Sequence, residues 1–228
     1  KLADRCHEAG VRCYLMMPRI FRKEAEQYFR KQMELLTSAG FDALGIGSME
    51  EPGFLREAGI ELPMYFDQGM YSWNHLAGAA MERYGADRLT IPVELNEREI
   101  RDSGVQGEMI VYGYLPMMIS AQCIRKTTLG CSGKSEIMWL KDRKDMRFPV
   151  VNQCRFCYNT IYNSAPLSLL GLSEQVTGLK PNAVRLNFTV EEPAAAGEIL
   201  DAFFEEYGMS EKAAEPPVLR NQFTRGHF

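Results

Sequence analysis

The chain has 228 residues, of which 46% are hydrophobic and 25% charged. These values are typical of a folded globular protein and exclude a collagen, a disordered tail and a small disulfide-rich domain, while the net charge of −4 gives no overall basic excess for nucleic-acid binding. The length allows a substantial core but is slightly short of the roughly 250 residues of a closed α/β barrel.

The first half of the chain alternates short apolar strands with amphipathic helices. After an opening helix that ends at Gly10, we predict strands at 11–17, 41–47, 62–67, 89–93 and 109–113, and helices at 24–39, 49–58, 72–84 (with Ser72 as the N-cap) and 96–102. Strands joined by helices in this way predict a parallel sheet with right-handed crossovers.

No glycine-rich dinucleotide-binding turn follows the first strand, so an arc of a (β/α)8 barrel is favoured over a doubly wound sheet. The chain opens inside a predicted helix and has five βα units. We therefore expect a fragment whose N-terminal barrel half is missing, or is supplied by an oligomeric partner.

The composition changes after residue 113. Four of the six cysteines lie in the polar and basic stretch that follows, and regular structure returns later with a strand at 183–189, a helix at 192–207 and an extended tail from 208. We expect an α/β protein in three parts: a barrel portion at 1–113, a cysteine-rich metal- or cluster-binding segment at 114–165, and a small α+β part at 166–228.

The compartment decides how the cysteines are interpreted. No apolar run reaches the roughly 18 residues of a membrane helix, and the first residues lack the apolar core of a signal peptide. We expect a cytoplasmic protein with no membrane partner, in which paired cysteines are metal ligands or thiols rather than disulfides.

Four cysteines follow one another as Cys123-x7-Cys131-x22-Cys154-x2-Cys157. Four thiolates can hold an iron–sulfur cluster or a tetrahedral zinc ion. Spacing alone leaves both alternatives open, because only one of the two pairs is tightly spaced. The other two cysteines lie on a predicted helix and a predicted strand and are expected to pack in the core.

A barrel carries its chemistry at the C-terminal ends of its strands. Arg19 follows the first strand there, and Glu94 follows the apolar run LTIPV, where partial desolvation would suit a carboxylate to acid–base work. Tyr112 lies in a nearly apolar run, and its hydroxyl needs a partner. We take Glu94, Tyr112 and Arg19 as candidate catalytic residues.

Several stretches resemble the U32 peptidase family, and most closely its long, collagenase-like members with an extra C-terminal domain. They are YSWN (71–74), RLTIPVELNEREI (88–100), GEMIVYGYLPMMISAQC (107–123), LKDRKDMRFPVVNQC (140–154) and TRGHF (224–228). Asn74, in the first of these, joins the candidate catalytic residues. Tyr112 stands where the family usually has a histidine.

The resemblance implies a barrel-type catalytic domain in which Cys123, Cys131, Cys154 and Cys157 hold a 4Fe–4S cluster. The family was named for a collagenase-like protease activity, but several members act in oxygen-independent hydroxylation of tRNA or ribosomal RNA bases or of ubiquinone precursors. We favour hydroxylation of an RNA base or a small aromatic. The alternatives are protein hydrolysis and a non-catalytic, metal-stabilised module.

Basic residues surround the four cysteines in the sequence, which suits contact with RNA phosphates. They are Arg125, Lys126, Lys134, Lys141, Arg143, Lys144, Arg147 and Arg155.

Overall fold

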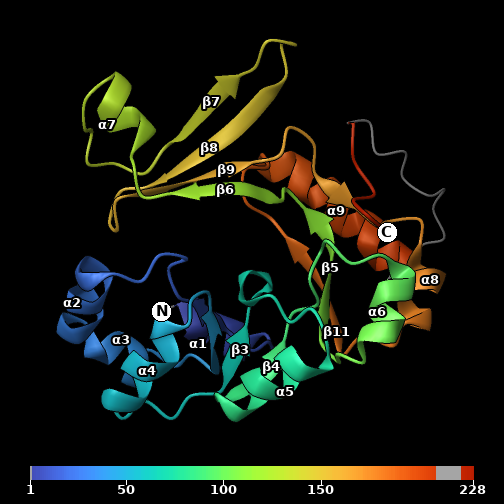
Figure 1. Ribbon diagram of the computed structural model, residues 1–228, viewed down its shortest axis with the longest axis horizontal. Coiled ribbons are helices and arrows are strands. Elements are labelled where there is room, and N and C mark those ends of the chain that lie inside the picture. The colour runs from blue at the N-terminus through green and yellow to red at the C-terminus, as the bar shows by residue number, and fades with distance from the viewer. Residues whose placement is uncertain (1, 209–221) are drawn as a thin grey trace. The chain divides into compact units, whose positions relative to one another are not determined.

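Figure 1 shows the computed structural model of the chain, which describes residues 2–208 and 222–228. The chain divides into two compact units, and each is described by itself. Unit 1 comprises residues 1–92 and 100–108, and unit 2 comprises 93–99 and 109–228. Most of the tail expected from residue 208 lies outside the described residues. None of the described helices is both long and apolar enough to cross a membrane.

Unit 1 is built on a parallel sheet of four strands in the order β1-β2-β3-β4. The strands are β1 (Tyr14–Met16), β2 (Ala43–Ile46), β3 (Met64–Phe66) and β4 (Ala86–Leu89). All four residues of β2 are buried, as in a parallel strand covered on both faces. The predicted parallel β–α repeat is confirmed, whereas the described residues do not show a barrel.

The helices of the first half lie near their predicted positions. They are α1 (Leu2–Glu8), α2 (Lys23–Lys31), α3 (Met33–Thr37), α4 (Glu50–Glu57), α5 (His75–Arg83) and α6 (Glu97–Ser103), with a short 3-10 helix η1 (Gln68–Met70). The single helix predicted over 24–39 is interrupted at Gln32, whose φ of −115° and ψ of 38° are not helical.

The N-cap of α5 is Asn74 rather than Ser72. The Asn74 Oδ1 atom accepts hydrogen bonds from two backbone N–H groups of the first turn, at 3.1 and 3.0 Å. Ser72 is buried instead, and its hydroxyl donates to the carbonyl of Thr90 at 2.9 Å. Both residue types are good caps, so the sequence alone did not separate them.

The fourth and fifth predicted strands also differ from the structure. β4 ends at Leu89, not at residue 93, since Pro92 has no N–H to donate to a sheet and the chain turns after it. β5 (Glu108–Gly113) lies in a separate sheet. A single parallel bridge between Thr90 and Glu108 joins it to the end of β4.

Unit 2 holds two sheets. The smaller has the order β10-β5-β11, and the larger is antiparallel with the order β6-β9-β8-β7. The elements of unit 2 are β6 (Pro116–Ser120), α7 (Ile124–Thr128), β7 (Ile137–Lys141), β8 (Arg147–Gln153), β9 (Tyr158–Tyr162), β10 (Leu167–Ser168), α8 (Ser173–Gly178), β11 (Ala183–Asn187) and α9 (Pro193–Glu206).

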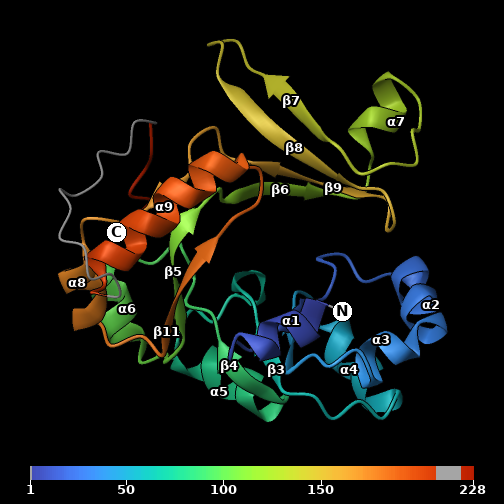
Figure 2. The ribbon, with the colours of Figure 1, turned by 180° about the vertical axis from the view of Figure 1, so that it is seen from behind.

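The segment expected to be cysteine-rich and metal- or cluster-binding, 114–165, thus contains a complete antiparallel sheet. Figures 1 and 2 show β7 and β8 as a hairpin that extends beyond β6 and β9. The strand predicted at 183–189 and the helix predicted at 192–207 are confirmed as β11 and α9.

Each unit has its own apolar core. Leu44, Ile46 and Phe66 of the parallel sheet are at most 1% exposed, and in unit 2 Val111 and Val150 are fully buried. Burial of side chains of this size contributes about 1.5–3 kcal/mol each. The two cores therefore give each unit a rigid frame on which polar loop residues are held.

Candidate functional site

The four cysteines of the sequence motif line one pocket of unit 2, with a volume of about 450 Å³. Within residues 2–208 and 222–228, no three His, Cys, Asp or Glu side chains come together closely enough to hold a single metal ion. The thiols therefore surround a space rather than meet at one point. The other lining residues are Ala121, Gln122, Lys126, Thr127, Asn152 and Tyr158.

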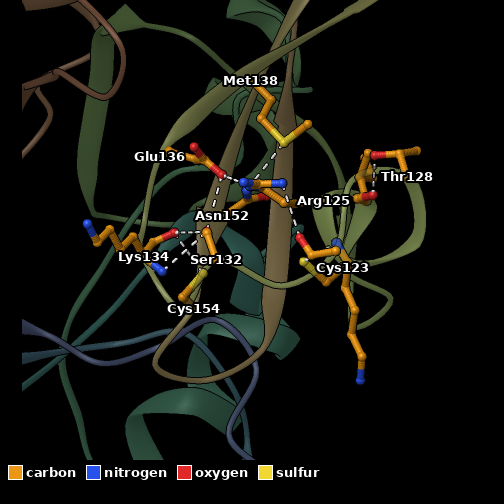
Figure 3. A network of polar contacts seen from close by, with 12 residues as sticks. Cys123, Arg125, Thr128, Ser132, Lys134, Glu136, Met138, Asn152 and Cys154 are labelled. Atoms are coloured by element: carbon orange, nitrogen blue, oxygen red, sulfur yellow. Dashed lines mark hydrogen bonds and ion pairs between the residues drawn. The ribbon is translucent and has the colours of Figure 1, made fainter.

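Cys154 and Cys157 lie in the turn of the β8–β9 hairpin. The turn is closed by a hydrogen bond from the N–H of Phe156 to the carbonyl of Gln153 at 3.1 Å, and Cys157 has a left-handed φ of 51°. The thiol of Cys154 donates to the carbonyl of Lys134 at 2.9 Å (Figure 3). The hairpin thus presents two thiols on a rigid element.

Cys123 is the N-cap of α7, and its Sγ atom accepts a hydrogen bond from the N–H of Lys126 at 3.4 Å. The backbone before it is fixed by the buried Asn159 of β9, whose Nδ2 donates to the carbonyl of Gln122 at 2.7 Å. Cys131 follows α7 in an exposed loop. The second pair of thiols is therefore carried by a short helix and its flanking loops.

An ion pair between Arg125 and Glu136 closes the loop that follows α7 (Figure 3). Arg125 also donates from Nη1 to the carbonyl of Gly130 at 3.1 Å, and Glu136 accepts from the hydroxyl of Ser132 at 3.4 Å. Arg125, expected from the sequence as a phosphate contact, thus takes part in holding this loop.

The pocket disfavours the thiolate form of Cys154. Burial raises the pKa of the Cys154 thiol, and Cys123, Cys131, Cys157 and Glu136 raise it further, because each would place a second negative charge nearby. A cation bound between the thiolates would remove that repulsion, since metal ligation deprotonates a coordinating thiol. The donor set and the shared pocket therefore fit a cationic centre with several sulfur ligands.

A second polar group lies at the carboxyl edge of the parallel sheet in unit 1. Arg19, after β1, pairs with Asp67, after β3, with 3.2 Å between Nη1 and Oδ2. The guanidinium lies against Gly69, where any Cβ would overlap it. Glycine at this position is what allows the close approach.

Glu51 of α4 completes this edge, and the sequence reasoning did not single it out. It is fully buried, and its Oε2 accepts from the N–H groups of Gly47 at 2.7 Å and Ser48 at 3.2 Å, while Oε1 has no hydrogen-bond partner in the described structure. Burial raises its pKa to about 8, against the opposing effect of the two N–H groups and Arg19. The spacing Ser48-x-x-Glu51 matches a capping-box sequence and was the signal available, but the N-cap of α4 is Met49 and the Ser48 hydroxyl has no hydrogen-bond partner in the described structure.

The four candidate catalytic residues have separate environments. In unit 1, Arg19 is in the ion pair described above and Asn74 caps α5. In unit 2, Glu94 is exposed in the turn after β4, so the partial desolvation expected for it is not observed.

Tyr112 is buried in β5, with its ring 5.7 Å from that of Phe188. Burial raises the pKa of Tyr112 above its ordinary value, and the charge of Glu191 raises it further by a smaller amount. Glu191 lies close enough to Tyr112 to affect its hydroxyl electrostatically. The site with the clearest convergence of predicted residues is the cysteine pocket.

Comparison with known proteins gives two matches. A family model described as "Peptidase family U32" matches residues 1–197. A solved structure described as that of the U32 peptidase Mk0906 aligns with a TM-score of 0.41 and 16% sequence identity, covering 50% of this chain and 51% of that chain. The chain thus spans about half the length of that structure. No curated protein matches.

Proposed function

The chain belongs to peptidase family U32, and on this premise we propose that Cys123, Cys131, Cys154 and Cys157 hold a 4Fe–4S cluster. The observation that carries the proposal is that all four line one pocket of unit 2. Four cysteine thiolates are the usual ligands of such a cluster. A zinc ion takes the same ligand set and is the alternative; it would require the thiols to move together, because in the described residues no three donor side chains are close enough to hold one ion.

The activity we propose is oxygen-independent hydroxylation of an RNA base or a small aromatic compound. When bound, an iron–sulfur cluster supplies one-electron chemistry. The chain's own residues would supply orientation, because Lys126, Asn152 and Tyr158, which carry an ammonium, an amide and a phenol, line the pocket. These groups suit a planar polar ring, which needs a few directed hydrogen bonds.

We further propose that β1–β4 are an arc of a barrel. The support is the strand order and the polar group of Arg19, Asp67 and Glu51 at the carboxyl edge, where barrels carry their ligand-binding residues.

The first test is the metal content of the full-length protein purified without oxygen. We expect iron and acid-labile sulfide in equal amounts, with both lost in Cys123→Ala and Cys154→Ala. Cys6→Ala is the matched control, because Cys6 is partly buried in α1, outside the pocket, and its removal leaves iron and sulfide unchanged. Zinc without iron would refute the cluster.

The second test is the RNA of a deletion strain, analysed by mass spectrometry of its nucleosides. We expect one hydroxylated nucleoside to disappear, and to return with the wild-type gene but not with Cys123→Ala. If hydroxylated quinone precursors disappear instead, the substrate is a small aromatic. Cleavage of denatured collagen that persists after all four cysteines are replaced would favour protein hydrolysis.

A further inference from the structure

We propose that the β7–β8 hairpin is a binding surface for single-stranded RNA. Trp139 is the stacking residue, and Arg143, Lys144 and Arg147 contact phosphates. The inference rests on the proposed function, since it names the surface that would hold an RNA substrate of the cysteine pocket. β8 connects the hairpin surface to the cysteine pocket, because it begins at Arg147 and ends next to the turn that carries Cys154 and Cys157.

Trp139 lies on an edge strand and contributes little to the core. The side chain is 56% exposed, and β7 pairs with β8 alone. In the antiparallel register Trp139 is opposite Pro149, and Ile137, which is 48% exposed, lies on the same face two residues away. A tryptophan of which more than half is in water, with an apolar neighbour, offers a flat surface on which a base can stack.

Cations flank this surface. Lys141 and Arg147 are directly opposite each other in the β7–β8 register, on the same face as Trp139, and like charges in this arrangement repel. Lys141 is neutralised by Asp145, at 2.6 Å. Arg143, Lys144 and Arg147 are exposed and form no ion pair with any residue that the structure describes.

The acidic residues of the hairpin cancel its basic charges only in part, because residues 137–151 hold four basic and two acidic side chains and keep a net charge of +2. Asp145 is committed to Lys141, and Asp142 shapes the turn, because its Oδ1 accepts from the N–H groups of Lys144 at 2.8 Å and Met146 at 2.9 Å. The hairpin therefore carries a local positive excess on a chain whose net charge is −4.

The combination of an exposed indole and unpaired cations identifies the occupant. A second copy of the chain, paired edge to edge through β7, would bring no anionic group to Arg143, Lys144 and Arg147, because β7 has no acidic residue. A duplex buries its bases and offers nothing to Trp139. A single strand provides both phosphates for the cations and an unstacked base for the indole.

The binding test uses the full-length, cluster-loaded protein and a fluorescein-labelled single-stranded RNA of mixed sequence, with fluorescence anisotropy as the readout. We expect Trp139→Ala to weaken binding about 10-fold, the effect of losing one stacked base. The triple variant Arg143→Gln, Lys144→Gln, Arg147→Gln is expected to reduce the slope of log K against log salt by about 2, which is three phosphate contacts at roughly 0.7 each.

A matched control replaces three exposed cations at α2, Arg22→Gln, Lys23→Gln and Lys31→Gln, which form no ion pair with described residues. This variant has the same change in net charge and is expected to bind RNA like the wild type. If it loses the same salt dependence, binding depends on overall charge and the hairpin assignment is wrong.

The protein has two tryptophans, which allows a direct reading of Trp139. In Trp73→Phe, the remaining indole emission comes from Trp139 alone. We expect it to be quenched when the single-stranded RNA binds and to be unchanged by a duplex of the same sequence. Unchanged emission at saturating single strand would overturn the stacking role.

These outcomes separate the hairpin from the cluster proposal. If iron, sulfide and RNA hydroxylation are confirmed but both hairpin variants bind RNA normally, the inference fails and the proposed function stands. If the hairpin variants lose RNA binding while the deletion strain retains every modified nucleoside, the inference stands and the hydroxylase proposal fails. A dimer that dissociates in Trp139→Ala in sedimentation velocity, with unchanged RNA affinity, would assign the surface to a second copy and overturn the inference.

Discussion

Replacing Glu51 by glutamine tests the strongest electrostatic perturbation in unit 1. The substitution keeps an oxygen to accept from the N–H groups of Gly47 and Ser48 and removes the titrating proton. The folded protein holds the Glu51 proton up to a pKa of about 8, whereas the unfolded chain releases it near the ordinary value of 4.5. Between these values the folded state binds more protons, so rising pH favours unfolding.

The magnitude follows from the two pKa values. Each pH unit inside the interval lowers the free energy of unfolding by about 1.4 kcal/mol, so the full interval amounts to about 5 kcal/mol. Stability from this group is complete below pH 4.5 and is lost as the pH rises toward 8. Relative to wild type, Glu51→Gln should therefore gain about 2–3 kcal/mol in free energy of unfolding between pH 5 and pH 7.

Urea unfolding followed by circular dichroism at pH 5, 6, 7 and 8 measures this difference. Other titrating groups cancel because both proteins carry them. Glu61→Gln, at an exposed position of the same unit, is the control and should follow the wild type at every pH. Parallel stability curves for Glu51→Gln and wild type would refute the burial argument, since they would mean that Glu51 is ionised in the folded protein.

Three further substitutions test local structure, each by urea unfolding. Asn74→Ala should lower the free energy of unfolding by about 1 kcal/mol through loss of the α5 cap, and Asn74→Asp should keep most of the wild-type stability. Equal stability of the wild type and both variants would contradict the capping role. Gly113→Ala should lower the free energy of unfolding by about 2 kcal/mol or more, because Gly113 has a φ of 147° and an added Cβ would overlap the carbonyl of Asn187. An unchanged urea midpoint would disprove this. Leu169→Ala, at a position 2% exposed, should cost about 3 kcal/mol, and a loss below 1 kcal/mol would show that the core closes around the gap.

The predictable part of the fold is the part with regular apolar runs. In unit 1, the strand at 43–46 is entirely buried and reads in the sequence as an unbroken apolar stretch, so its type and place were clear. The antiparallel sheet of unit 2 gives no such signal. In the sequence β7 shows no alternation of apolar and polar residues, because residues 137–140 are all apolar, and the exposure of Ile137, Trp139 and Leu140 is not what such a run predicts.

The candidate site was predictable to the same extent. Cysteine spacing alone pointed to the four thiols, and the structure places them in one pocket. Asn152 and Tyr158 also line it, but their inclusion depends on the register of β8 with β9, which no local pattern encodes. The partial desolvation predicted for Glu94 is not observed, because the strand on which it depended ends at Leu89 and Glu94 lies in the exposed turn that follows.

The two sides of the cysteine pocket differ in how firmly they are held. The β8–β9 turn is anchored by a ladder that includes the fully buried Val150, whereas α7 has no buried residue and is held by the Arg125–Glu136 pair and a few hydrogen bonds that water can replace. Backbone amide hydrogen exchange should therefore be faster in residues 123–131 than in the β8–β9 hairpin. The pocket accordingly has one wall held by a strand ladder and one wall held by few contacts, and we expect a group that enters or leaves to displace the α7 side more easily.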